Sequence, residues 1–310
     1  MRFFKLSTAA LLSFTFVLTF LVGQINGQSG PSADVSQDWM RVRSNDGDFS
    51  IEVPARHTYF KNLDGFVVYA DGQDRLMSDV HMIRGNMNGT FITLEVYNAD
   101  KSVVDLIYED DKRINWQKLS KTKRGKVDIK QLKQETDKFY AVAHYISYKN
   151  KIYILTAASR KGATAEITRF LNYSFEPAQA GDGSVAFKEL KFDDVEFEIL
   201  PEEKVKAPTP KPAQQTKPAA PLEPSLIMLR VPRASYVDTA RINKISGAVR
   251  LKLTLSAEGH VPSVKVVRSL PDGLLRQALF AALRFTFLPK EENGVPVPVI
   301  KTLDYTFKIY

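Results

Sequence analysis

The 310-residue sequence contains no cysteine and only four histidines. The lack of cysteine excludes disulfides, thiolate metal sites and cysteine nucleophiles, so packing must hold the fold together. The histidines are scattered, and no HExxH, GxSxG or GxGxxG motif accompanies them. We therefore expect no enzyme and no cofactor. The alternative, a hydrolase in the middle of the chain, requires a deep polar pocket lined by His81 or His144.

Long blocks of one charge are also missing. Lys and Arg number 43 against 35 Asp and Glu, a net charge of +8 in which no block of like charges is long enough to suggest a nucleic-acid arm. This distribution does not predict a nucleic-acid partner. The adjacent carboxylates of Glu109-Asp110-Asp111 and Asp193-Asp194 lack the glycine and the spacing of an EF-hand, so they are typical of a solvated face and predict no metal site.

One long apolar run opens the chain. Arg2 and Lys5 precede the uncharged segment Leu6 to Val22, the layout of an export signal, so the chain is expected to leave the cytoplasm. As a helix this segment reaches about 25 Å, the short limit for crossing a bilayer. Residues 1–27 are therefore either a cleaved signal peptide or a membrane anchor, and both alternatives stay open. Residues 28–38 form a polar spacer.

Residues 39–200 are predicted to form an α+β domain. Alternating apolar residues predict a mostly antiparallel sheet. Helical spacing at 103–116 and 163–171 predicts helices that cover one face of it. The expected strands are 49–53, 66–70, 78–83, 90–97, 140–148 and 152–158, with tight turns at Asn88-Gly89 and Asn150-Lys151 and two extended pieces within 185–200. The segment Tyr153 to Phe175 weakly resembles PsbP-like extracytoplasmic domains, which implies no activity.

Residues 201–225 form a proline-rich linker. Seven of the 16 prolines lie between Pro201 and Pro224, alternating with lysine and alanine. Proline fixes φ and lacks an N–H, so this stretch is predicted to be an extended spacer without a core. Its role is either that of a passive linker or that of a mechanical link.

Residues 226–310 are predicted to form a small β-β-α-β domain. Strands at 248–255 and 261–268 flank a turn at Glu258-Gly259, and a helix follows with Asp272 as its N-cap. The helix carries an apolar stripe, with Arg276 and Arg284 outside it, and Pro289 is expected to stop it. A long final strand covers 297–310. The stripe consists of Leu275, Leu279, Ala282 and Leu283.

This C-terminal part resembles the TonB C-terminal domain family. The motifs that carry the resemblance, in order, are Ala240-Arg241, Ile245-Ser246-Gly247-Ala248-Val249, Ala257-Glu258-Gly259-His260-Val261, Val264 to Pro271, Ala281-Ala282, Phe285 to Pro289 and Asn293-Gly294-Val295-Pro296-Val297. One departure is that Tyr236 is followed by Val237, where the family commonly has Tyr-Pro. Another is that Leu6 to Val22 lacks the histidine common in family anchors.

The resemblance implies binding by strand addition. An edge strand presents unpaired backbone groups that an extended segment of a partner can satisfy. In TonB-like proteins this segment belongs to an outer-membrane TonB-dependent transporter. The alternative is an edge protected by the chain's own turn or by dimerisation. The residues implied in partner binding through their backbone are Val299, Lys301, Leu303, Tyr305 and Phe307.

The resemblance also implies a periplasmic location and energy transduction. An anchored chain would couple a proton-driven inner-membrane motor to uptake through the transporter. A secreted chain released by signal cleavage would instead be a two-domain envelope adaptor that binds without transducing energy. Residues 226–310 carry 13 basic and 6 acidic residues. This surplus either steers an acidic partner or only keeps the surface soluble.

Overall fold

The computed structural model describes residues 39–309, with gaps at 63–65, 71–72, 113–115, 117, 177–180, 182, 188–195 and 200–224. The expectations for the leader or anchor, the polar spacer and the proline-rich linker lie outside these residues. Within the described part, no helix is long and apolar enough to cross a membrane. The described residues belong to one compact unit, Ser36–Tyr310.

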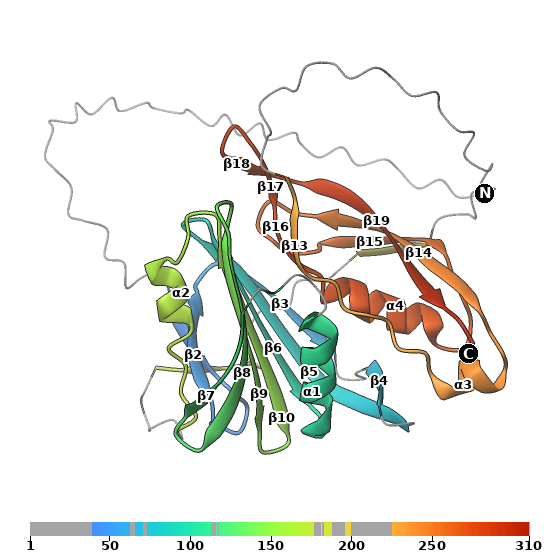
Figure 1. Ribbon diagram of the computed structural model, residues 1–310, viewed down its shortest axis with the longest axis horizontal. Helices are drawn as coiled ribbons and strands as arrows, with labels where there is room; N and C mark the ends of the chain where they lie inside the picture. Colours follow the sequence, from blue (N-terminus) through green and yellow to red (C-terminus); the bar gives the residue numbers. More distant parts are fainter. Residues whose placement is uncertain are drawn as a thin grey trace, which may run out of the picture. The chain divides into compact units, whose positions relative to one another are not determined.

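The largest element is an eight-stranded antiparallel sheet, as the alternating patterns predicted (Figure 1). Its order is β3-β5-β6-β10-β9-β8-β7, and β4 pairs with β5 off this path. The strands are β3 (His57–Asn62), β4 (Phe66–Ala70), β5 (Gln73–Met87), β6 (Thr90–Asn98), β7 (Lys118–Arg124), β8 (Val127–Glu135), β9 (Tyr140–Tyr148) and β10 (Lys151–Ser159).

Two hairpin turns test the turn predictions. Asn88-Gly89 connects β5 to β6 with φ values of 54° and 81°, as its sequence predicts. The turn between β9 and β10 lies at Lys149-Asn150, one residue earlier than expected, because Lys149 takes a positive φ of 53° and β10 begins at Lys151. The hairpin of β7 and β8 was not expected, since its charged residues hide the apolar alternation.

Helices cover both faces of this sheet, so the expectation of one covered face is wrong. The reason is visible in β10, where successive apolar residues are all buried. Ile152 and Ile154 join the apolar cluster of α1 (Ser102–Lys112), whereas Tyr153 and Leu155 join that of α2 (Ala165–Phe170). A small sheet of β1 (Trp39–Arg43), β2 (Ser50–Pro54) and β11 (Val185–Ala186) packs with α2.

The C-terminal module, defined here as residues 225–309, contains the predicted β-β-α-β core. Helix α4 (Leu274–Leu283) packs on a four-stranded sheet of order β12-β15-β14-β19. Its strands are β12 (Glu196–Ile199), β14 (Gly247–Leu255), β15 (Ser263–Arg268) and β19 (Val299–Phe307). The remaining elements are β13 (Ile227–Arg230), α3 (Asp238–Ile242), β16 (Thr286–Leu288), β17 (Lys290–Glu292) and β18 (Val295–Val297).

Three local predictions in this module are wrong. The N-cap of α4 is Gly273 at φ 81°, not Asp272, which itself takes a φ of 57°. The helix ends at Leu283, before β16 and Pro289. The final strand is interrupted at Pro298, because proline offers no N–H to a ladder.

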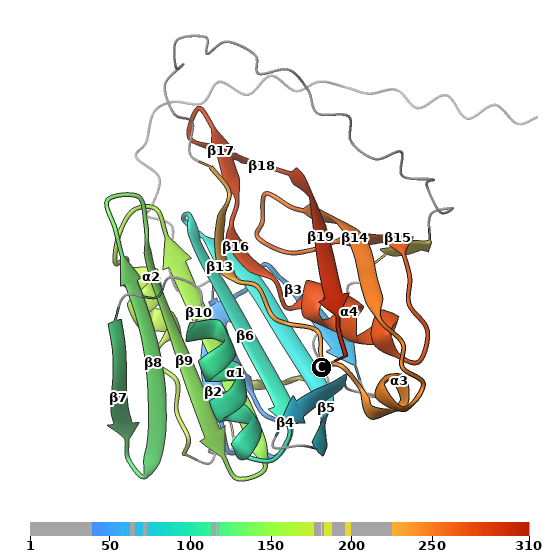
Figure 2. The same ribbon diagram turned by 45° about the vertical axis from the view of Figure 1, so that its right-hand side comes forward.

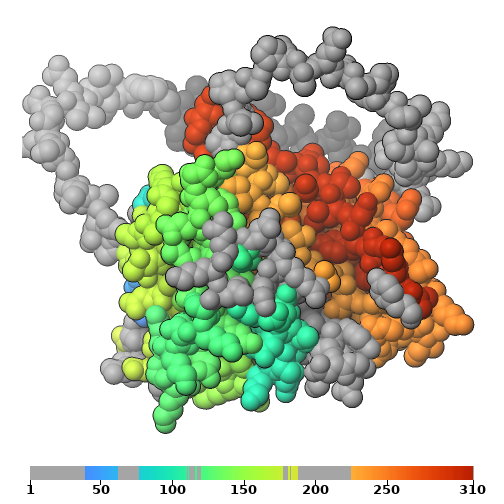
Figure 3. All heavy atoms as spheres, viewed as in Figure 1, coloured from blue at the N-terminus to red at the C-terminus, as the bar shows by residue number. Residues whose placement is uncertain are grey.

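The C-terminal module covers the same face of the large sheet as α1. Leu229, Phe280 and Leu288 of the module belong to the same buried apolar cluster as residues of β6, β9 and β10. Two views from different angles place β13 and β16 beside β6 (Figures 1 and 2). In the space-filling view the orange atoms of the module lie directly against the green strands (Figure 3). The module therefore contributes to the core of the middle domain (residues 39–199).

Candidate functional site

Strand β19 forms an edge of the module's sheet. It pairs with β14 over nine positions, from Gly247 opposite Phe307 to Leu255 opposite Val299. The other side of β19 has no strand partner among the residues that the structure describes. Red atoms of this C-terminal part reach the molecular surface (Figure 3). The strand thus presents the kind of edge that accepts an added strand.

The side chains of β19 alternate between the module's core and the solvent. Val299, Lys301 and Leu303 are half-buried, and Tyr305 and Phe307 are buried. The five residues implied in partner binding thus share the face that packs inward, so their side chains contribute to the fold. The solvent-facing residues are Ile300, Thr302, Asp304 and Thr306.

One end of β19 is fixed by an aromatic contact. The rings of Tyr236 and Phe307 lie 5.9 Å apart, edge to face. The Tyr236 hydroxyl donates a hydrogen bond to the backbone carbonyl of Ile245, just before β14 begins. This tyrosine therefore ties α3, β14 and β19 together although Val237 follows it in place of the family's proline.

A pair of opposite charges stabilises the solvent face. Arg250 on β14 donates two hydrogen bonds to the carboxylate of Asp304 on β19, at 2.7 and 2.8 Å. Hydrogen bonding from Arg250 lowers the pKa of Asp304, and Arg268 adds to this effect. Asp304 is therefore held as a carboxylate in the middle of the edge strand.

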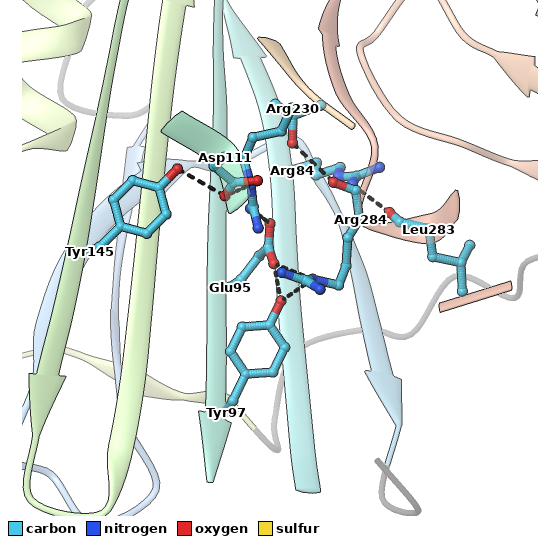
Figure 4. A network of polar contacts seen from close by, with 9 residues as sticks. Arg84, Glu95, Tyr97, Asp111, Tyr145, Arg230, Leu283 and Arg284 are labelled. Atoms are coloured by element: carbon cyan, nitrogen blue, oxygen red, sulfur yellow. Dashed lines mark hydrogen bonds and ion pairs between the residues drawn. The ribbon is translucent and has the colours of Figure 1, made fainter. Parts of the chain in front are cut away.

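A buried charge network joins the module to the large sheet (Figure 4). Arg230 at the end of β13 forms ion pairs with Glu95 on β6 and with Asp111 on α1. Arg284, directly after α4, lies 3.2 Å from Glu95 and donates to the Tyr97 hydroxyl at 3.0 Å. Side chains from both parts of the chain thus share one buried cluster.

Two further contacts complete the network. Arg84 on β5 donates to the backbone carbonyl of Leu283 at 2.5 Å, and the Tyr145 hydroxyl donates to Asp111 at 2.9 Å. The side chain of Arg230 is fully buried, and those of Glu95 and Asp111 are 0% and 2% exposed. A buried ion cluster of this kind is strongly destabilised when one partner is removed.

Burial and neighbouring charges shift the pKa values of this cluster. Burial lowers the pKa of Arg84 to about 10 and also lowers that of Arg284. Although burial opposes the charge of Arg230, the carboxylates of Asp111 and Glu95 raise its pKa. Burial raises the pKa of Asp111 against the opposing effect of Arg230. The three guanidinium groups thus share two carboxyl groups, and the arginine charge depends on them.

The sequence did not reveal this network. Arg284 was expected outside the apolar stripe of its helix, but it is 5% exposed. Asp111 was expected on a solvated face, but it pairs with Arg230 in the core. Because Asp111 follows Glu109 and Asp110, the sequence predicted a run of exposed acidic residues. No local sequence pattern links Glu95 to Arg230 and Arg284, which are more than 100 residues away.

His81 and His144 lie in the core of the middle domain. The Tyr59 hydroxyl lies 2.5 Å from Nδ1 of His81, whose Nε2 lies 3.0 Å from Asp79. His144 pairs with the Tyr173 hydroxyl at 3.1 Å. Burial lowers the pKa of His144 to about 4, and Arg124 adds to this effect. Both rings are thus held by tyrosines within packed apolar clusters.

Metal-ligating residues are scattered in the part of the chain that the structure describes. Within the described ranges, no three His, Asp or Glu side chains are grouped to hold a metal ion. The pair Asp193-Asp194 lies outside the described residues.

The module matches a known family. Residues 232–309 match the model described as Gram-negative bacterial TonB protein C-terminal, which confirms the resemblance carried by the sequence motifs. No curated protein matches the chain. Proteins of the matched family are envelope-associated, take part in transport and interact with outer-membrane transporters. The match covers residues 232–309 and indicates a TonB-like C-terminal domain.

Proposed function

We propose that this chain is a periplasmic TonB-like protein whose C-terminal module binds an extended segment of an outer-membrane transporter along β19. With an anchored N-terminus, it would transmit energy from a proton-driven inner-membrane motor for uptake. The observation that carries this proposal is the pairing of β19 on one side only among the described residues.

Main-chain hydrogen bonds would supply much of the affinity. In a strand, alternate residues direct their backbone groups to the same side, so nine residues offer about four or five residues to a partner. Each hydrogen bond contributes about 0.5–1.5 kcal/mol net. The inward face of β19 supports the edge through Tyr305 and Phe307, which keep the strand rigid before binding.

A secreted adaptor is the second candidate function. The buried network favours it, because Arg230 and Arg284 hold the module against the middle domain instead of leaving it free on a tether. The adaptor would use the same edge but would transmit no force. Mass spectrometry of the mature N-terminus separates the two: a chain that begins near Gln28 leaves only the adaptor.

The experiment that tests strand addition is site-specific photo-cross-linking in cells. A photoreactive residue replaces Ile300, whose side chain is 72% exposed on β19. The matched control replaces Lys123, which is 75% exposed on β7 of the large sheet. We expect an outer-membrane transporter cross-linked from position 300 and not from position 123. Cross-links only to a second copy of the chain would support dimerisation and contradict the proposal.

A pair of proline variants tests the backbone contact. Adjacent N–H groups of a strand point to opposite sides, so one of Lys301→Pro and Thr302→Pro removes a bond to β14 and the other removes a donor from the open side. We expect one variant to lose stability and the other to fold but lose transporter-dependent uptake. Normal uptake by both folded variants would refute strand addition.

Deleting the whole module is a poor test. The deletion would remove Arg230 and Arg284 from Glu95 and Asp111 and would expose the apolar cluster that the module covers, so the middle domain would lose stability as well. Point changes on the outer side of β19 avoid this effect.

A further inference from the structure

The opposite edge of the module's sheet is occupied by a segment of the same chain. Strand β12 pairs in parallel with β15, with Glu196 opposite Ser263 and Ile199 opposite Val266. This four-residue strand lies outside the family match, which begins at residue 232. The matched region alone would have two edges, β15 and β19, and the chain covers the first of them with its own residues.

The edge along β15 is basic. Lys265 on β15 stands directly opposite Lys252 on β14, and Arg268 stands opposite Arg250. Like charges placed directly opposite each other destabilise a sheet. Arg250 is paired with Asp304 on β19, the neighbour of β14 away from β15. Arg268 lies exposed on β15. The sheet therefore becomes more positive from β19 towards β15.

The sequence of β12 complements this charge. It reads Glu-Phe-Glu-Ile, with acidic residues at alternate positions, and Glu198 stands in register with Lys265. Alternate residues of a strand repeat at about 6.6–6.8 Å, which is also the repeat along the neighbouring strand. In this register Glu198 stands opposite Lys265 and Glu196 opposite Ser263, so an extended segment that brings a carboxylate opposite Lys265 matches the charge of β15.

We propose that β15 is a second strand-binding edge, selective for acidic extended segments, and that Glu196–Ile199 is its exchangeable occupant in the same chain. The chain thereby closes this edge against foreign strands and against pairing with a second copy. A partner strand is then directed to β19. Parallel pairing is less stable per residue than antiparallel pairing, and the strand is short, so exchange is energetically accessible.

Peptide binding tests the proposal directly. The probe is a fluorescent synthetic peptide with the sequence of residues 193–200. The full-length variant Phe197→Pro places a proline inside the four-residue strand β12, which disrupts its pairing and opens the edge of β15. We expect this variant to bind the peptide at least 10-fold more tightly than the wild-type protein, whose edge is filled. Equal affinities, or no binding to either protein, would overturn the proposal.

Charge reversal tests the selectivity. A peptide with Gln in place of both Glu196 and Glu198 is expected to bind about 10-fold more weakly, and added salt should narrow the difference. Adding Lys265→Glu to the Phe197→Pro protein should lower its affinity for the acidic peptide. It should raise the affinity for a peptide that carries Lys in place of Glu198. A Gln peptide that binds as well as the acidic one would refute selectivity.

A cross-link keeps the proposal testable should Phe197→Pro fail to fold. Because the chain has no cysteine, Glu196→Cys with Ser263→Cys introduces one defined pair in register. We expect the disulfide to form under mild oxidation and excess peptide to slow its formation. No cross-link, or a rate unchanged by the peptide, would contradict an exchangeable strand. None of these readouts involves β19, so their failure leaves binding at β19 to its own test.

Discussion

Arg230 and Glu95 are 135 residues apart in the sequence, yet they form an ion pair in which neither side chain is exposed. Arg230 lies just before the region that matches the TonB family, and Glu95 lies in the centre of the middle domain's sheet. A TonB-like module on a flexible tether would need no such contact. This pair therefore indicates that the module and the middle domain fold together.

Replacing Arg230 by methionine should strongly destabilise the protein. Arg230→Met leaves the carboxyl groups of Glu95 and Asp111 buried without their main partner. Breaking a buried ion pair in this way costs about 3–5 kcal/mol. The measurement is urea unfolding at pH 7, followed by tryptophan fluorescence and circular dichroism.

The control for this variant is Arg268→Ala, which removes an exposed arginine from the same module. We expect it to change the free energy of unfolding by less than about 0.5 kcal/mol. The wild-type protein should also unfold in one transition seen equally by both probes. A loss below about 1 kcal/mol for Arg230→Met, or two separate transitions in the wild type, would contradict a shared core.

Gly259 makes a close approach that alanine cannot repeat. An alanine Cβ would lie 2.6 Å from Cδ1 of Phe91, and φ at this position is +86°. Gly259→Ala should therefore destabilise by about 1–2 kcal/mol for the backbone and by about 1–3 kcal/mol more for the clash. The free energy of unfolding, measured in the same urea experiment, reports the sum of the backbone cost and the clash cost.

Gly294→Ala is the matched control for this variant. Its φ is +78°, and a Cβ there would meet nothing within 4 Å, so only the backbone cost applies. The difference in the free energy of unfolding between the two variants reports how tightly the turn at Gly259 packs against Phe91 of the middle domain. Equal losses would show that Phe91 moves aside freely.

Patterns that depend on local sequence were predicted well. Strands 66–70 and 140–148 match β4 and β9, because alternation and turn residues act over a few positions. The order β-β-α-β of the module followed from the same signals. The polar hairpin of β7 and β8 was missed, because the many charged residues of its strands interrupt the apolar alternation.

The binding edge and the buried charge network were predicted only in part from the sequence. The final strand and the alternation of its side chains were predicted from the strand period, whereas its role as a partner-binding edge was implied by the family resemblance. The burial of Arg284 depends on Glu95, a residue of another domain, and no helical period contains that information. Strand β12 was expected only as an extended piece, since four residues carry no signal for the edge that they join.

Acid should destabilise the protein through His144. Burial, together with Arg124, lowers the pKa of His144 to about 4, whereas an unfolded histidine titrates near 6.5. A lowered histidine pKa gives stability above pH 6.5 that is lost as the pH falls towards 4. The loss from this residue is about 3 kcal/mol.

The measurement is the free energy of unfolding at pH 7.5, 6.0, 5.0 and 4.5 for the wild type and for His144→Gln. The variant keeps a polar group near Tyr173 but has no charge to gain. As the pH falls, we expect the wild type to lose more free energy of unfolding than the variant. A constant difference across this range would show that His144 does not carry the effect.

Cutting the chain in the proline-rich linker should not separate its two parts. A protease site introduced between Pro201 and Pro224 would give an N-terminal fragment with β12 and a C-terminal fragment with the module. The fragments remain connected through the buried ion network, the shared apolar cluster and the pairing of β12 with β15. We therefore expect them to co-elute in size-exclusion chromatography at micromolar concentration. Arg230→Met should release them, and a cut wild-type protein that separates under the same conditions would mean that the linker alone holds the module.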